Sequence, residues 1–231
     1  MYEAFEKQPQ EKKQLIIDVA IEEFVKNGYD KTSTDTITGR AGISKGILFH
    51  YFTSKKNLYL YLVRYSIALL SEKVVTAIKE LKSEDFFERV KEIYLLKHEM
   101  TGQFIKETQL IADAVSSPPV TVHVEIQKII HDHHSIYEKS FILEHIFLKE
   151  LIEREKLRED IKVEQVIEMT IFVCEQLSSK YQILYKNNQY DFLKKPDPAV
   201  QELDDYLKII KYGVYKQSYI AAVLDYRKGS E

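Results

Sequence analysis

The sequence contains few residues that interrupt helices or cross-link chains. Among 231 residues there are seven glycines, five prolines, one cysteine and no tryptophan. Few glycines and prolines leave few turns, and the abundant leucine, isoleucine, lysine and glutamate favour long helices. The single cysteine, Cys174, cannot form an intramolecular disulfide, so we interpret it as a buried structural thiol in a reducing compartment. We therefore expect an all-α protein.

Long apolar runs are also missing. No run approaches the roughly 18 to 20 residues that a membrane-spanning helix needs, and the first ten residues, MYEAFEKQPQ, are too polar for a signal peptide. We expect a cytoplasmic protein with no membrane partner. The chain also has no phosphate-binding glycine loop, nucleophile elbow, HExxH sequence or paired cysteines. We therefore expect no enzyme activity, no catalytic or metal-binding residues and no cofactor.

Charge is distributed unevenly along the chain. The net charge of −3 is not typical of a nucleic-acid binder. However, residues 31–56 contain five basic residues and one acidic residue, whereas residues 57–231 contain 24 basic and 28 acidic residues. The positive charge is thus concentrated in one short stretch.

That stretch, residues 32–52, has the pattern of two short helices joined by a tight turn. Gly42 is placed to end the first helix in a left-handed conformation, while Ser33 and Ser44 are placed to cap the two helices. At about 100° per residue, Leu48 and Phe52 share the inward face of the second helix. The outward face then carries Lys45, Gly46, Phe49 and His50, with Ile47 and Tyr51 on its flanks. This pattern predicts a helix-turn-helix.

Further helices are predicted around this motif from apolar periodicity. Residues 11–27 form an amphipathic first helix that Gly28 ends, and a long helix follows from residue 57. Later helices are expected at residues 86–93, 104–115, 120–157, 163–184 and 203–214. The last two repeat apolar residues at the spacing of a helix bundle. We divide the chain into a helix-turn-helix domain, residues 1–56, and a larger helical domain, residues 57–231.

Residues 27–59, NGYDKTSTDTITGRAGISKGILFHYFTSKKNLY, resemble the DNA-binding signature of the tetracycline-repressor (TetR) family. The resemblance implies an N-terminal three-helix DNA-binding domain and a larger all-helical domain for ligand binding and dimerisation. It implies a homodimeric repressor that binds a near-palindromic double-stranded DNA operator. A small apolar or aromatic effector would release the protein from that operator.

The resemblance also implies roles for individual residues. Ser33 and Thr34 would open a helix at a phosphate, and Tyr51 and Lys55 would bind phosphates. The predicted DNA-binding residues are Ser33, Thr34, Ser44, Lys45, Gly46, Ile47, Phe49, His50, Tyr51 and Lys55. Phe49 stands where tyrosine is usual in the family, and Ile47 where a small polar residue is usual. Both changes favour contacts with thymine methyl groups over hydrogen bonds.

The larger domain offers candidates for effector binding. Six residues lie on helices that the resemblance places around a cavity, and most of them combine apolar surface with a polar group. They are Tyr94, His98, His134, Tyr137, Phe141 and Gln176. His131 and His134 also have an i, i+3 spacing that a metal ion can use, although surface or pocket-lining histidines are the favoured interpretation. Two alternatives stay open: a DNA-bound scaffold whose second domain binds another protein, and a metal-dependent enzyme.

Overall fold

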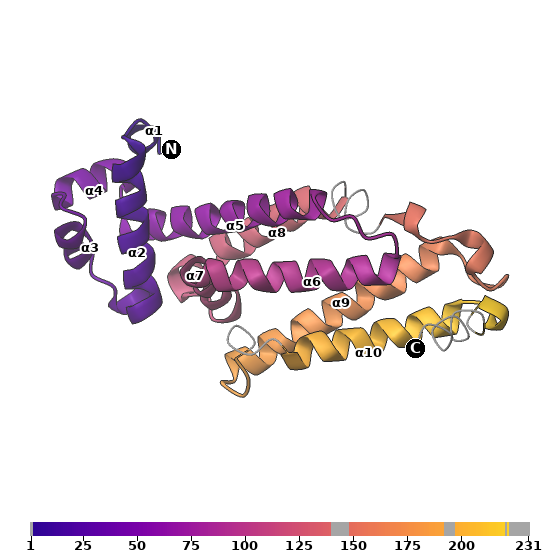
Figure 1. Cartoon of the computed structure of the whole chain (residues 1–231). Helices are drawn as coiled ribbons and strands as arrows, with labels where there is room; N and C mark the ends of the chain where they lie inside the picture. The colour runs from indigo at the N-terminus through magenta and orange to yellow at the C-terminus, as the bar shows by residue number, and fades with distance from the viewer. Residues whose placement is uncertain (1, 140–147, 192–196, 220, 222–231) are drawn as a thin grey trace. The chain divides into compact units, whose positions relative to one another are not determined.

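The computed structural model describes residues 2–139, 148–191, 197–219 and 221, and within these residues the chain is almost entirely helical (Figure 1). The α-helices are α1 (Glu3–Glu6), α2 (Gln10–Lys31), α3 (Thr34–Arg40), α4 (Lys45–Phe52), α5 (Lys55–Lys79), α6 (Phe86–Gln103), α7 (Ile105–Ser116), α8 (His123–Lys139), α9 (Val163–Lys186) and α10 (Asp197–Val214). Short 3₁₀ helices are η1 (Val120–Val122), η3 (Lys149–Leu151) and η4 (Arg154–Lys156). The expected all-α class is confirmed.

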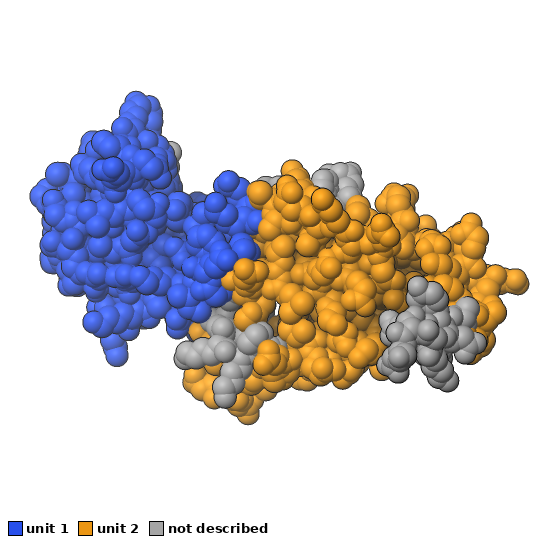
Figure 2. All heavy atoms as spheres, viewed as in Figure 1, with its two compact units in different colours: residues 1–73, 100–135 blue, residues 74–99, 136–231 orange. Residues whose placement is uncertain are grey.

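The chain forms two compact units (Figure 2). Unit 1 comprises residues 1–73 and 100–135, and unit 2 comprises residues 74–99 and 136–231. The sequence-based boundary after residue 56 falls in the first turn of α5 and stays a prediction. None of the helices in the described part of the chain is both long and apolar enough to span a lipid bilayer.

Unit 1 has one continuous hydrophobic core. It includes side chains from α1 to α5 and also from α7 and α8: Phe5, Ile16, Phe24, Ile37, Leu48, Phe52, Leu58, Leu62, Leu110, Ala114 and Ile126. Helices α3 and α4 lie on one side of α2, and the first half of α5 leads away on the other side (Figure 1). The helix-turn-helix is therefore held in the same core as α7 and α8.

Local sequence explains how these helices begin and end. Gly28 has φ 70° and ψ 168°, and Gly42 has φ 65°, so both adopt conformations that favour glycine where a helix is interrupted or ends. The Ser33 hydroxyl accepts a hydrogen bond from the amide of Asp35, and the Ser44 hydroxyl accepts one from Ile47. The predicted roles of Gly42, Ser33 and Ser44 are confirmed, whereas Gly28 interrupts α2, which continues to Lys31.

The structure differs from the sequence prediction in three places. Helix α1 was not predicted, yet its Phe5 is fully buried. Tyr51 joins Leu48 and Phe52 on the inward face of α4, which therefore holds three residues and not two. The helix predicted for residues 120–157 is wrong over its last ten residues, where the chain forms η3 and η4.

Backbone pairing explains the third difference. Leu157 forms an isolated antiparallel bridge with Tyr215. The amide of Arg158 donates to the carbonyl of Val214 at 2.9 Å, and the amide of Lys216 donates to the carbonyl of Lys156 at 3.1 Å. The segment after α10 thus supplies backbone partners that a helix would otherwise supply internally.

Unit 2 is built from α6, α9 and α10 together with the end of α5 and the 3₁₀ turns. Helices α9 and α10 pack against each other along the predicted seams, which are confirmed. The inner residues include Val166, Leu177, Tyr181, Leu203, Leu207 and Ile210. The Arg89 guanidinium donates to the carbonyls of Ile78 and Leu81 at 3.3 and 3.2 Å, so it satisfies the free carbonyls at the end of α5.

Candidate nucleic-acid interface

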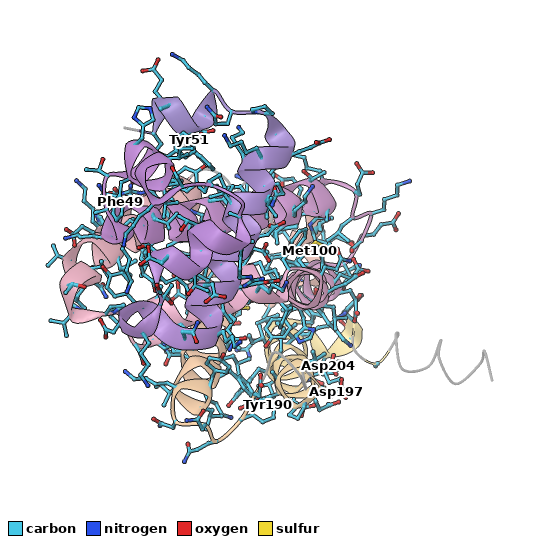
Figure 3. All side chains as sticks on the ribbon, turned by 90° about the vertical axis from the view of Figure 1, so that its left-hand side faces the viewer. Phe49, Tyr51, Met100, Tyr190, Asp197 and Asp204 are labelled. Atoms are coloured by element: carbon cyan, nitrogen blue, oxygen red, sulfur yellow. The ribbon has the colours of Figure 1, made fainter. Side chains whose placement is uncertain are left out.

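The predicted DNA-binding residues lie at the beginnings of α3, α4 and α5 and along the outer face of α4. Figure 3 looks onto this side of unit 1 and labels Phe49 and Tyr51 on α4. Exposed members of the set are Ser33, Ser44, Lys45, Gly46, Ile47, Phe49 and His50. Thr34 and Lys55 are half-buried, and Tyr51 is buried. The first turn of α4 therefore presents an almost continuous exposed surface.

An ion pair joins α3 and α4 at this surface. The ammonium of Lys45 lies 2.9 Å from a carboxylate oxygen of Asp35, and both side chains are more than half exposed. Exposed pairs of this kind contribute little to stability, with a median of about 0 to 1 kcal/mol. Lys45 can therefore exchange Asp35 for a DNA phosphate at small cost.

The outer face of α4 carries two partly exposed apolar side chains, Ile47 and Phe49. Ile47 is 37% exposed and Phe49 is 36% exposed. Neither side chain carries a hydrogen-bonding group, so both can only make apolar contacts with base edges, such as the thymine methyl group. His50, which follows Phe49, is exposed, and its imidazole can form hydrogen bonds with bases.

Lys55 is held against the end of α2. Its ammonium donates to the carbonyl of Asp30 at 3.0 Å and lies 4.9 Å from the centroid of the Tyr29 ring. Burial lowers the pKa of Lys55, and the nearby Asp30 partly offsets that effect. An ammonium has three N–H donors, so this geometry fixes the side chain and leaves donors for a phosphate.

A shared carboxylate lies behind the interface. Glu22 of α2 pairs with Arg40 of α3 at 2.5 Å and with Lys106 of α7, while Arg40 also pairs with Glu23 at 2.7 Å. Hydrogen bonds from Lys106 and then Arg40 lower the pKa of Glu22. One side chain thus connects the helix-turn-helix to α7 within unit 1.

Three of the six effector candidates have described side chains, two on α6 and one on α9. Tyr94 lies on α6, half-buried against the core of unit 2, and His98 follows one turn later. Gln176 lies on the exposed face of α9. His134 and Tyr137 belong to the backbone of α8, but their side chains lie outside the described residues, and Phe141 lies outside them entirely.

Residues that the sequence did not single out for effector binding interact electrostatically with Tyr94. Burial raises the pKa of Tyr94 to about 12, with further contributions from Cys174, Tyr190 and Glu202. The rings of Tyr181 and Tyr190 lie 5.4 Å apart, and the Tyr181 hydroxyl donates to Glu202 at 3.0 Å. Cys174 and Tyr181 lie seven residues apart on the apolar seam of α9. This spacing is the sequence pattern that could have indicated them as candidates for effector binding.

The histidine cluster does not form a metal site in the described part of the chain. His131 is exposed, and His133 is paired through its Nε2 atom with the Ser71 hydroxyl at 3.3 Å. No group of three or more potential metal ligands occurs among the described residues. The side chain of His134 lies outside the described residues, so the i, i+3 pair with His131 stays a prediction.

These features define an all-α helix-turn-helix protein with a separate helical unit. Residues 16–62 match the family described as bacterial regulatory proteins, tetR family. This match covers the helix-turn-helix region, and it confirms there the resemblance noted above. QacR of Staphylococcus aureus, an HTH-type transcriptional regulator, is 46% identical over 48 residues, which are 21% of this chain and 26% of that protein.

Solved structures show the same fold over most of the chain. A TetR family transcriptional regulator from Chloroflexus aurantiacus is 23% identical, with a TM-score of 0.51, and the match covers 93% of this chain and 98% of that one. FadR from Bacillus subtilis, in complex with stearoyl-CoA, is 18% identical, with a TM-score of 0.52, and the match covers 82% and 96%. The curated relatives match over only 24% to 38% of their own length. QacR and the proteins of both solved structures are described as transcriptional regulators.

Replacing Glu22 by glutamine should reduce the stability of unit 1 at neutral pH by up to about 1 kcal/mol, because the pairs are partly exposed. The lowered pKa of Glu22 means that its contribution is complete above the unfolded pKa of about 4.3 and is lost as pH falls through the folded value. Denaturant titrations of both proteins from pH 7 to 3 should therefore converge at low pH. Lys106→Met should reproduce part of this loss of stability. A difference in stability between the Glu22→Gln and natural proteins that persists at pH 3 would contradict the role of the Glu22 ion pairs.

Proposed function

We propose that the protein is a transcriptional repressor that binds DNA as a homodimer and is released by a small molecule. The observation that carries this proposal is the exposed first turn of α4, capped by Ser44 and joined to α3 through Lys45 and Asp35. A surface of this shape fits the major groove, where the second helix of a helix-turn-helix contacts base edges. A cytoplasmic location is part of the same proposal.

Phosphate contacts are proposed to supply most of the affinity. Lys45, Lys55 and the capped N-terminus of α4 lie along one surface of unit 1, where the local charge is positive. Such contacts position a protein on the duplex, whereas base contacts select the sequence. Among the exposed residues, His50, Phe49 and Ile47 are the candidates for base contacts.

A second copy of the chain is proposed to cover the outer face of α9 and α10. This face carries large apolar side chains at helical spacing: Met169, Phe172 and Ile183 on α9, and Tyr206, Ile209 and Tyr212 on α10. Phe172 is 60% exposed and Ile209 is 69% exposed, which is unfavourable in water. A two-fold pairing of these helices forms a four-helix layer and provides two DNA-binding heads for half-sites about 34 to 36 Å apart.

The effector is proposed to bind near Tyr94 in unit 2. The Tyr94 phenol is partly buried and interacts electrostatically with Cys174 and Tyr190, and the Tyr190 ring contacts that of Tyr181, which suits an apolar or aromatic ligand. Helices α5, α6 and α8 each contribute residues to both units, so a change in unit 2 reaches unit 1 through continuous helices. The ligand needs only a differential affinity of about 1 to 3 kcal/mol for the two states.

Substitutions on the DNA surface should separate the two kinds of contact. Lys55→Ala should weaken binding to every duplex alike and reduce the slope of log K against log salt by about 0.9, the value for one phosphate. His50→Ala should instead change the preferred sequence, measured by selection from random DNA. Lys79→Ala, with the same charge change at the opposite end of α5, is the control. If neither Lys55→Ala nor His50→Ala alters binding, the DNA surface is assigned wrongly.

Charge on the outer face of α10 should prevent dimerisation. Ile209→Glu should raise the dimer dissociation constant at least about 100-fold, because a carboxylate at a buried apolar interface is strongly unfavourable. Sedimentation equilibrium measures the constant. Val124→Glu, at a valine of α8 that is 76% exposed, should leave it unchanged. An Ile209→Glu protein that remains dimeric would require another interface.

A tryptophan introduced at position 94 should report the effector directly, because the natural chain contains no tryptophan. In Tyr94→Trp, ligands that bind near this position should change the emission as they release the protein from DNA. A panel of small aromatic and long-chain aliphatic compounds provides the probes. Val120→Trp, at a site of η1 that is 95% exposed and outside the proposed dimer face, is the control and should not respond. Release from DNA with no change at position 94 would place the effector elsewhere.

A further inference from the structure

The end of the recognition helix α4 is packed against the N-terminal segment of the chain. Phe5 of α1 contacts both Tyr51 and Phe52, and Lys12 of α2 reaches the Tyr51 hydroxyl. The family resemblance already implies that Tyr51 binds a phosphate; we infer that Lys12 joins it, so that the two side chains hold one phosphate of the DNA backbone. In this site Lys12 positions the phenol and adds its own positive charge; the inference rests on the proposed DNA-binding function.

Hydrogen-bond direction supports this pairing. The ammonium of Lys12 donates to the Tyr51 hydroxyl oxygen at 3.1 Å and to the side-chain oxygen of Gln8 at 3.1 Å. Because an ammonium is only a donor, Tyr51 must accept in this contact. The proton of Tyr51 is then left to donate elsewhere, and the third N–H of Lys12 has no partner among the described residues. Two donors, one of them charged, therefore lie next to each other.

The Tyr51 ring cannot easily turn away from this position. Its centroid lies 5.5 Å from that of Phe5 and 6.3 Å from that of Phe52, and the residue is only 6% exposed. The Lys12 ammonium lies 5.6 Å from the ring centroid, at a distance where a cation is attracted to the ring. Gln8 is held in turn by a hydrogen bond from its amide to the carbonyl of Ala4 at 3.1 Å. Helix α1 thus fixes both donors.

A phosphate suits these donors better than a group of this chain. Both carboxylates of α1 already have partners: Glu6 accepts from Tyr61 at 2.8 Å and pairs with Lys13 at 3.2 Å, and Glu3 pairs with Lys7 at 2.6 Å. Tyr51 also directly follows the exposed His50 on α4, next to the proposed groove-facing residues. Charge-assisted hydrogen bonds to phosphate are strong, and pre-positioned donors lose little entropy on binding. The pair therefore adds a phosphate contact beside the base-reading face.

Lys12→Met keeps the length of the side chain and removes its charge and donors. On a duplex obtained by selection, it should weaken binding to all sequences alike and reduce the salt slope by about 0.9. Lys12→Arg should restore the slope. Tyr51→Phe should weaken binding without changing the slope, because it removes a hydroxyl and no charge. Lys7→Met is the matched control, since Lys7 is exposed and pairs with Glu3 at 2.6 Å.

The double variant tests whether the two residues act as one site. Lys12→Met should cost less affinity in the Tyr51→Phe background than in the natural protein, because neighbouring groups that share a partner are not additive. A slope unchanged by Lys12→Met, or a thermal destabilisation with the slope intact, would overturn the inference and leave only a structural role. Failure of the natural protein to bind any selected duplex would instead overturn the proposed function.

Discussion

The burial of Leu48, Tyr51 and Phe52 fixes the recognition helix, and the proposed DNA surface depends on it. Helix α4 has eight residues, and isolated helices shorter than about 12 to 15 residues are marginal in water. Its stability therefore comes from packing and from the cap at Ser44. Because three of its eight residues face inward, the other five are presented to solvent in one fixed orientation.

This anchoring extends far along the sequence. Phe5 packs on the end of α4, and the same core continues through Phe24 to Leu110 and Ile126 in α7 and α8. The DNA-binding helices cannot shift as a group without α7, and Glu22 adds polar connections to both Arg40 and Lys106. An effector that displaces α7 by a small amount would therefore move the whole helix-turn-helix, since packed cores transmit strain.

The sequence predicted the elements whose signals are local. Glycine at position 42, serine caps at positions 33 and 44, and the seams of α9 and α10 each follow from a few neighbouring residues, and all are present. Helix α1 was missed because four residues show no periodicity, and its formation depends on the burial of Phe5 against residues that lie about 50 positions away in the sequence. The η3 and η4 region was predicted wrongly for the same reason, because Leu157 pairs with Tyr215.

The candidate sites show the same limit. Exposure of the first turn of α4 followed from periodicity, but the contact between Lys12 and Tyr51 joins residues 39 positions apart and no local pattern indicates it. Gln176, an effector candidate, shows how neighbours in sequence separate in space. It is adjacent to the inner seam residue Leu177 in sequence, yet at about 100° per residue it falls on the outer face with Phe172 and Ile183. Its amide therefore lies within the apolar face proposed for the dimer.

The composition of the α4 surface affects how such a regulator would work. Apolar contacts from Ile47 and Phe49 discriminate weakly, because a thymine methyl group offers a small contact area and no directional bond. In the proposed dimer, specificity then depends on the spacing between the two helix-turn-helix motifs. Each phosphate contact requires its side chain to lie at a fixed position on the DNA. Affinity that depends on many positioned phosphate contacts is sensitive to a small change in that spacing. An effector can therefore release the DNA without touching the base-reading residues, provided that it prefers the altered spacing.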